Sequence, residues 1–147
     1  MSLNIYNDTI PAAVLSVDGD FTDPFSVTMD GLVGGSTETR LYVRNDSTAY
    51  YYTGTTLTPE DTSGGSIVDG TDGFSWKLRA GNTQPTATEW ADIEAGDPIQ
   101  LNNIGSSGSP DISTYLPFWI RVEIPKNAAT STFTDVQLKI NSTQNDV

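Results

Sequence analysis

The fold class of this chain follows from the stretch Trp119-Ile120-Arg121-Val122-Glu123-Ile124. Apolar and polar residues alternate in it with a period of two, the pattern of a β-strand with one buried and one solvated face. The same alternation recurs at residues 25–30, 40–44, 74–79 and 136–140. Clusters of Gly, Pro, Asp, Ser and Thr separate these segments. Short strands joined by turns predict an all-β chain that folds as an antiparallel β-sandwich or barrel, and we expect the sandwich.

The rest of the chain completes a single Ig-like antiparallel β-sandwich with one short helix. Strands are expected at about 13–17, 25–30, 38–45, 50–57, 74–79, 99–101, 117–125 and 133–141, with Pro59 ending the fourth. The helix is expected at about 86–95. Thr86 as N-cap and Glu89 three residues later form a capping box. Trp90 and Ile93 lie on one face of this helix, and Gly96 ends it.

A length of 147 residues suits one domain. We expect an N-terminal arm at 1–11, the sandwich at 12–141 and a polar C-terminal tail at 142–147. Strand parity predicts a core of Leu15, Val17, Phe25, Val27, Leu41, Val43, Phe74, Trp76, Leu78, Ile120, Val122, Ile124, Val136, Leu138 and Ile140. A Trp76→Ala change in such a core should cost about 3–5 kcal/mol.

The composition excludes several function classes. The chain has no Cys and no His, which removes thiolate catalysis, Cys- or His-ligated metals and a Ser-His-Asp arrangement. A net charge of −12 would repel nucleic acid and anionic membranes. No stretch approaches the ~20 apolar residues of a membrane helix, and the first eight residues do not resemble a signal peptide. Neither a nucleic-acid nor a membrane partner is expected.

Acidic turns are the only candidate metal ligands. Asp18 and Asp20, with Asp23, and separately Asp69 and Asp72, supply oxygen atoms in glycine-bent loops that could bind calcium. Neither set has the EF-hand spacing, and Asp-Gly pairs are also common in β-turns. A carboxylate pair could hydrolyse glycosides, but a small sandwich offers little cleft in which to desolvate one. We expect a non-enzyme without a cofactor, in which these residues form turns.

Five of the seven basic residues occupy solvent-facing strand positions: Arg40, Arg44, Lys77, Arg79 and Arg121. One interpretation is cross-strand ion pairing with Glu38 and Glu123. The other is an electropositive stripe that docks on an acidic partner. Tyr42, Trp119 and either Tyr51 or the Tyr50/Tyr52 pair share the outward parity. Such aromatic residues stack on sugars, anchor protein interfaces or lie under a covering loop.

The first eleven residues carry apolar side chains ahead of the first clear strand. They include Leu3, Ile5, Tyr6 and Ile10. Such an arm either adds a strand to the sheet edge of a neighbouring subunit or folds back onto its own edge strand. The first alternative predicts a homo-oligomer or a lattice-bound protein. The residues expected to contact a partner are then Leu3, Ile5, Tyr6, Ile10, Arg40, Tyr42, Arg44, Lys77, Arg79, Trp119 and Arg121.

Four strings carry a family resemblance: Leu41-Tyr42-Val43-Arg44-Asn45-Asp46, Gly73-Phe74-Ser75-Trp76-Lys77-Leu78, Pro85-Thr86-Ala87-Thr88-Glu89-Trp90 and Thr114-Tyr115-Leu116-Pro117-Phe118-Trp119-Ile120-Arg121-Val122. Over residues 38–141 the chain resembles small β-sandwich structural proteins of tailed bacteriophages. The resemblance implies a virion component whose partners are capsid or other virion proteins. A capsid decoration protein is expected first, and a neck, tail or baseplate subunit second. A carbohydrate-binding or adhesin-type module, with a glycan as partner, is the competing class.

Overall fold

A computed structural model describes residues 2–8, 13–17, 27–61, 67–128 and 136–147. Its strands are β1 (Leu3–Tyr6), β2 (Val14–Val17), β3 (Gly35–Asn45), β4 (Tyr50–Asp61), β5 (Ser75–Ala80), β6 (Ile99–Gln100), β7 (Leu116–Ile124) and β8 (Val136–Asp146). One short α-helix, α1 (Ala87–Ala91), and a 3₁₀ turn, η1 (Thr71–Gly73), complete the described elements. The predicted all-β class is confirmed.

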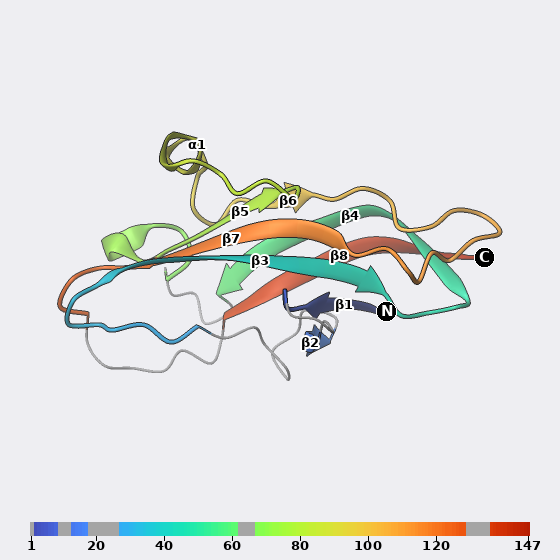
Figure 1. Cartoon of the computed structure of the whole chain (residues 1–147), viewed down its shortest axis with the longest axis horizontal. Helices are drawn as coiled ribbons and strands as arrows, with labels where there is room; N and C mark the ends of the chain where they lie inside the picture. The colour runs from blue at the N-terminus through green and yellow to red at the C-terminus, as the bar shows by residue number, and fades with distance from the viewer. Residues whose placement is uncertain (1, 9–12, 18–26, 62–66, 129–135) are drawn as a thin grey trace.

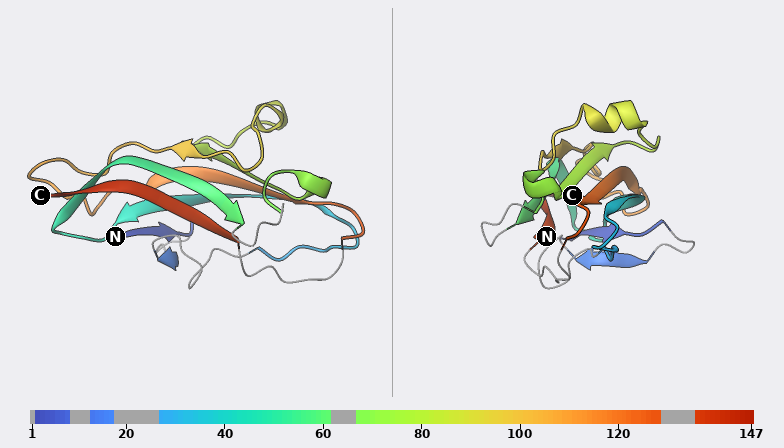
Figure 2. Two further views of the ribbon diagram at one scale, coloured as in Figure 1. Left: turned by 180° about the vertical axis from the view of Figure 1, so that it is seen from behind. Right: turned by 90° about the vertical axis from the view of Figure 1, so that its left-hand side faces the viewer.

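The strands form two antiparallel sheets that face each other (Figures 1 and 2). Sheet A has the order β2-β1-β3-β7-β5, and sheet B has the order β6-β4-β8. Figure 1 shows β3 and β7 in front of β4 and β8, and the view from behind in Figure 2 reverses this order. The two sheets are therefore separate layers, as expected for a sandwich.

The core lies between the sheets and is built mainly from alternate strand residues. Of the predicted core, these side chains are buried: Leu41, Val43, Leu78, Ile120, Val122, Val136, Leu138 and Ile140. Leu15, Val27 and Trp76 pack against the core but are only partly buried, and Phe74 and Ile124 are half-buried. Phe25 and the side chain of Val17 lie outside the described part. The core also contains residues that strand parity did not predict: Leu3, Ile5, Tyr52, Leu57, Leu101, Ile104 and Phe118.

The expected N-terminal arm is in fact an internal strand. β1 lies between β2 and β3, where Ile5 pairs with Ser16 on one side and with Val43 on the other. Leu3 and Ile5 have no solvent exposure. The prediction that these two side chains contact a neighbouring subunit is therefore wrong. The chain folds back because their spacing of two matches the inner face of the sheet. Ile10 lies outside the described residues.

The expected polar tail is also a strand. β8 continues to Asp146, and its last residues pair with the start of β4 from Tyr50 to Thr53. Backbone hydrogen bonds and an exposed outer face allow a polar sequence here. The hydroxyl of Tyr52 ties both chain ends together, because it accepts a hydrogen bond from the Ser2 amide (3.0 Å) and donates one to Gln144 (3.1 Å).

Two further strand predictions, one strand end and one whole strand, differ from the structure. Pro59 does not end β4, which runs to Asp61 and pairs with β8 beyond the proline. β6 pairs only with Thr56 and Leu57, so one side of β4 is already a sheet edge at Pro59, where proline is tolerated. Residues 27–30, the described part of the expected strand at 25–30, form no strand. They lead into a turn that is held by Asp30.

The helix begins where the capping box predicts but is shorter than expected. The Thr86 hydroxyl accepts from the Glu89 amide (3.3 Å), and the Glu89 carboxylate accepts from the Thr86 amide (3.2 Å). α1 ends at Ala91 rather than near residue 95. The chain then turns back toward sheet A, where the Gly96 amide donates to the Trp76 carbonyl (2.9 Å). This return contact leaves no room for a second helical turn.

Candidate interaction surface

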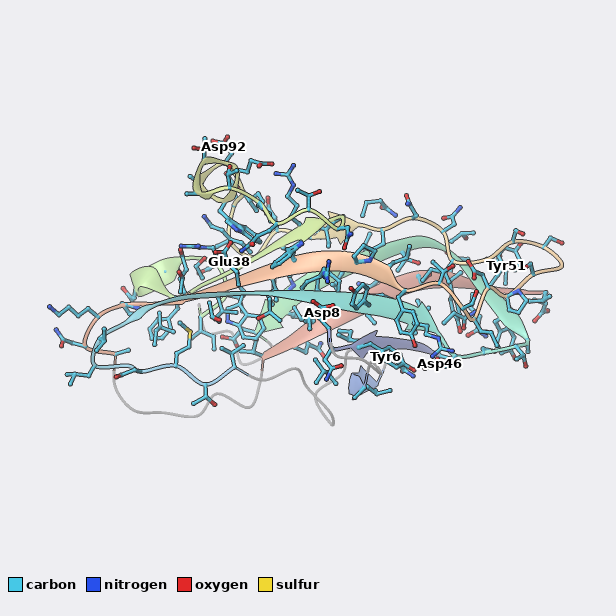
Figure 3. The ribbon with its side chains drawn as sticks, in the orientation of Figure 1. Tyr6, Asp8, Glu38, Asp46, Tyr51 and Asp92 are labelled. Atoms are coloured by element: carbon cyan, nitrogen blue, oxygen red, sulfur yellow. The ribbon has the colours of Figure 1, made fainter. Side chains whose placement is uncertain are left out.

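The outward residues of four neighbouring strands gather on one side of sheet A (Figure 3). Across β3, β7 and β5, Arg40 lies opposite Trp119, which in turn lies opposite Arg79. Two residues further along β7, Arg121 lies between Glu38 of β3 and Lys77 of β5. We call this surface the outer face of sheet A and define it by Tyr6, Arg40, Tyr42, Arg44, Lys77, Arg79, Tyr115, Trp119 and Arg121. Strand parity thus brings together the predicted basic and aromatic residues.

A cluster of tyrosine rings and guanidinium groups occupies the open half of this face. The Tyr115 ring meets the rings of Tyr6 and Tyr42 edge to face, with centroids 5.3 and 5.9 Å apart. The guanidinium of Arg44 lies 5.0 Å from the Tyr115 centroid and 5.6 Å from that of Tyr6, and it donates to the Tyr115 hydroxyl (2.9 Å). Arg40 lies 5.6 Å from the Tyr42 centroid. Each contact favours the same packed arrangement.

Tyr115 is the member of the cluster that the alternation of strand residues could not predict. It lies one residue before β7, outside every expected strand. Its place is set by Arg44, whose Nε also donates to the Ile112 carbonyl (2.6 Å) and so holds the preceding loop against β3. The sequence carries no signal for this contact, because residues 44 and 112 are distant along the chain.

Two carboxylates complete the cluster. Asp8 accepts hydrogen bonds from Arg40 Nε (3.1 Å) and Nη2 (2.9 Å) and from the Tyr42 hydroxyl (2.9 Å). These contacts, with Arg40 first and Tyr42 second, hold the pKa of Asp8 below its usual value. Asp46 accepts from the Tyr6 hydroxyl (2.6 Å). Burial, together with this hydrogen bond, raises the pKa of Tyr6 to about 12.

The other half of the face is covered by α1. Trp90, 2 % exposed, donates its indole N–H to Glu38, and Lys77 donates to the Trp90 carbonyl (3.0 Å). Arg121 pairs with Glu38 (3.3 Å) and with Glu123 (2.7 Å). The expected ion pairing with Glu38 and Glu123 is therefore confirmed for Arg121. In this half, hydrogen bonds and ion pairs hold α1 against sheet A as a second layer.

The charges of the face balance. Its four arginines pair with Asp8, Asp46, Glu89, Glu38 and Glu123 of the same chain, and Lys77 lies beside them. Five acidic residues thus accompany five basic ones, which leaves two basic and fourteen acidic residues elsewhere in the sequence. Of the two interpretations, ion pairing within the chain fits the structure and an electropositive stripe does not, because acids of the same chain neutralise it. The net charge of −12 is carried outside this ion-paired set.

The aromatic residues do not form an open stacking platform. The Arg40 and Arg44 guanidinium groups already lie against the tyrosine rings. Trp119 is half-buried, and its indole N–H donates to the Asn82 carbonyl (3.1 Å). Tyr51 belongs to β4 of sheet B and lies opposite Asn145, so it does not extend this group. The geometry favours a protein contact over a row of sugar-stacking rings.

The acidic turn at residues 69–72 has a structural role. The Asp69 carboxylate accepts a hydrogen bond from the Thr71 amide (3.0 Å), and hydrogen bonds from Thr71 lower the pKa of Asp69. Asp72 is exposed and adopts a left-handed backbone conformation (φ 54°). Both features are typical of a tight turn. Asp18, Asp20 and Asp23 lie outside the described residues.

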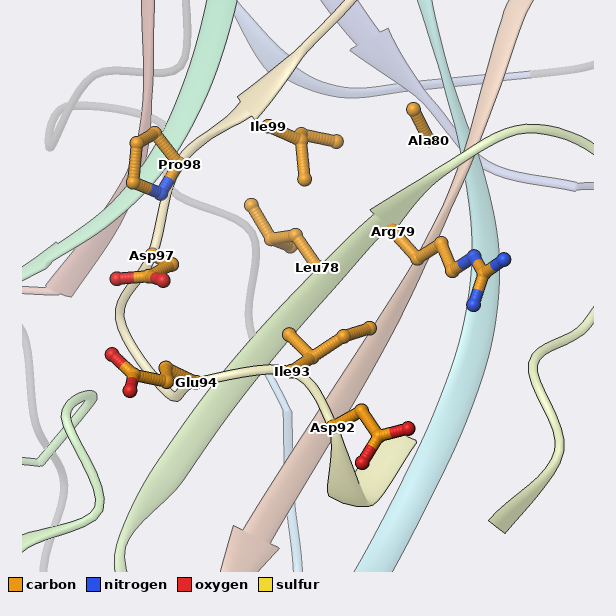
Figure 4. A pocket seen from close by; sticks show the side chains of 9 residues that line it. All are labelled: Leu78, Arg79, Ala80, Asp92, Ile93, Glu94, Asp97, Pro98 and Ile99. Atoms are coloured by element: carbon orange, nitrogen blue, oxygen red, sulfur yellow. The ribbon is translucent and has the colours of Figure 1, made fainter. Parts of the chain in front are cut away.

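An open hollow of about 650 Å³ lies beside the segment that follows α1 (Figure 4). The apolar part of its floor is formed by Ile93 and Ile99 next to the buried Leu78, and the charged residues around it are Arg79, Asp92, Glu94 and Asp97. It shares Arg79 with the outer face of sheet A but lies outside the cluster of Tyr6, Arg40, Tyr42, Arg44 and Tyr115, which we call the Tyr–Arg cluster. Sequence reasoning did not identify it, because it forms where β5, β6 and the segment 92–98 come together in the folded chain.

Comparison of the chain with protein-family models, with characterised proteins and with solved structures finds no match. In the part of the chain that the structure describes, no helix combines the length and apolar character needed to cross a membrane. The chemistry of the molecule's own surface is therefore the basis for inferring its function.

Proposed function

We propose that this protein is a non-enzymatic structural protein of a tailed-phage virion, which decorates the capsid and docks through the outer face of sheet A. The observation that carries the proposal is the contrast between this charge-balanced face and the acidic remainder of the chain. Charged residues that are neutralised within one chain can be covered by a partner at a lower desolvation cost than isolated charges.

The composition of the face supports a contact with another protein. Tyrosine and arginine are enriched among the residues that dominate binding energy at protein interfaces. Tyr42, Tyr115 and Arg44 are already held by ring contacts and hydrogen bonds, so docking would cost little side-chain entropy. Arg40 and Arg44 have side-chain exposures of 28 % and 26 %, which leaves area to bury.

The distribution of charge also suits a particle surface. In the described part of the chain, the exposed acidic residues outside the ion-paired set are Asp30, Asp69, Asp72, Asp92, Glu94, Asp97 and Asp146. A strongly negative exterior would keep particles apart in solution. This argument, together with the resemblance to phage structural proteins, favours the capsid exterior.

The first test is quantitative mass spectrometry of purified virions that carry this gene. A copy number close to that of the major capsid protein supports decoration. A far lower copy number would move the protein to the neck, tail or baseplate. Complete absence from the particle would refute the virion role.

The second test measures docking on particles from a phage that lacks the gene. Tyr115→Ala should weaken docking by about 30-fold or more, as expected for a residue at the centre of an interface. Lys139→Ala is the matched control, because its side chain is 46 % exposed on sheet B. Equal affinity of both variants would exclude this face. Binding to a glycan array that is lost in Trp119→Ala would instead favour the carbohydrate-binding class.

A further inference from the structure

Two apolar side chains project from the end of the sandwich. Leu32 and Val33 are 71 % and 67 % exposed, more than any other large hydrophobic residue in the described part of the chain. They form the tip of the turn between residues 30 and 34, at the left-hand end of the molecule in Figure 1. Exposed neighbouring apolar residues of this kind are typical of contact sites.

The tip is held in a defined conformation. The Asp30 carboxylate accepts hydrogen bonds from the Leu32 amide (2.9 Å) and the Val33 amide (3.4 Å), and the Asp30 carbonyl accepts one from Gly34 (2.9 Å). The Asn127 amide donates to the Leu32 carbonyl (3.2 Å), which anchors the tip to the turn after β7.

Glycine at position 34 is required for this anchoring. Gly34 has a φ of +71°, and a Cβ there would lie 2.6 Å from the Lys126 amide nitrogen. The tip is therefore preorganised and presents its apolar side chains beside the exposed Lys126.

The hollow beside α1 has the complementary chemistry. The apolar part of its floor is formed by Ile93 and Ile99 next to the almost fully buried Leu78. Asp92, Glu94 and Asp97 stand around it, together with Arg79, whose charge is paired with Glu89 (Figure 4). No basic side chain of the described residues lies within ion-pair distance of these three carboxylates. Among the described residues, no acidic side chain lies within ion-pair distance of Lys126.

We propose that the Leu32–Val33 tip of one copy inserts into the hollow beside α1 of a second copy, with Lys126 against the carboxylates around the hollow. The apolar tip covers the apolar floor, and the single cation meets the acidic rim. Tip and hollow are different surfaces, so the contact is heterologous and each copy keeps one free tip and one free hollow. Copies therefore associate head to tail into rings or chains.

This inference goes beyond capsid docking. The tip and the hollow lie outside the Tyr–Arg cluster, and the hollow shares only Arg79 with the outer face of sheet A, so a copy docked through the cluster can still reach its neighbour. Repulsion between two molecules of charge −12 keeps the association weak in dilute solution. Docking on a lattice would raise the local concentration of the protein and favour the contact.

The test is a mixing experiment with the purified full chain, followed by sedimentation velocity up to about 1 mM protein. Wild-type protein should form a concentration-dependent series of oligomers. Leu32→Asp has a defective tip and an intact hollow. A Glu94→Lys, Asp97→Lys double variant has an intact tip and a defective hollow. Each should associate at least about tenfold more weakly than the wild type.

The mixture of the two variants decides the question. One intact tip and one intact hollow remain between them, so the mixture should form a heterodimer and nothing larger. Val147→Asp, an acidic change at another exposed apolar residue (44 %), is the control that should leave association unchanged. A monomeric wild type, wild-type association of either variant, or a monomeric mixture would each overturn the proposal. None of these outcomes depends on capsid binding, so docking is judged separately.

Discussion

Replacement of Ile5 by alanine should destabilise the whole sandwich, although the residue is only four positions from the N-terminus. Ile5 has no solvent exposure and belongs to the main core cluster. Its backbone pairs with Ser16 of β2 and with Val43 of β3. A strand that is fixed on both sides cannot shift to fill the space that a smaller side chain would leave.

The size of the effect follows from this confinement. Ile→Ala changes in protein cores cost about 2–5 kcal/mol, with the larger values at sites that collapse least. We therefore expect about 3–5 kcal/mol for Ile5→Ala. For a domain of this length, a loss of about 1 kcal/mol lowers Tm by roughly 2–4 °C, so the melting temperature should fall by roughly 6–20 °C.

Equilibrium unfolding in urea, followed by tryptophan fluorescence, measures this change. The matched control is Leu32→Ala, which removes a large side chain at 71 % exposure and should stay within about 0.5 kcal/mol of the wild type. A mobile arm would give both variants the same small effect. If Ile5→Ala loses less than about 1 kcal/mol with an unchanged slope m, the burial of β1 in the core is refuted.

Three further predictions concern hydrogen-bonded side chains. Because the pKa of Tyr6 is raised from 10.0 to about 12, its contribution to stability should be complete below pH 10 and lost as the pH rises from 10 to about 12; Asp46→Asn should lower this pKa in an ultraviolet titration. Thr86→Ala removes the cap of α1 and should cost about 0.5–2 kcal/mol, with a red shift of Trp90 emission. Asn45→Ala should cost about 2–4 kcal/mol in urea unfolding, because it leaves the Tyr50 and Pro110 carbonyls without their buried donor.

Period-two patterns located the strands with one clearly buried face. β3, β5 and β7 lie where Leu41, Leu78 and Ile120 alternate with charged neighbours. The capping box located the start of α1 for a related reason, since both of its hydrogen bonds join residues three positions apart. Signals of this kind are local in sequence. They survive folding because the local geometry and the tertiary packing favour the same arrangement.

The errors concern segments whose structure depends on distant partners. β1 offers only two apolar positions, Leu3 and Ile5, which do not distinguish a strand from an arm. The end of β8 is polar, and it is a strand because β4 supplies its hydrogen-bond partners. Asn45 has no exposure, yet its burial depends on carbonyls at residues 50 and 110. Such pairings bring together residues that are far apart in the chain and leave no periodic trace.

The same distinction applies to the candidate surface. Parity placed Arg40 and Arg121 on one face, because parity determines direction within a strand. It could not determine net charge, since Asp8 reaches Arg40 from a segment before β2 and Glu89 reaches Arg79 from the helix. The positions of these acidic partners depend on the tertiary fold. They convert an apparent cationic stripe into a neutral surface. Docking through this surface therefore depends on contact chemistry rather than on long-range attraction.

Neutrality of the face reverses the expected effect of salt. An electropositive stripe on an acidic partner would bind less tightly as ionic strength rises, because counterions screen the attraction. A balanced face has little long-range attraction to lose, while the whole molecule at −12 still repels other negatively charged surfaces. Added salt shortens the reach of that repulsion to about 10 Å at 0.1 M. The apolar and aromatic contacts of Tyr115 or Leu32 remain, since burial of apolar surface does not depend on charge. Docking through the outer face of sheet A should therefore hold or strengthen with salt.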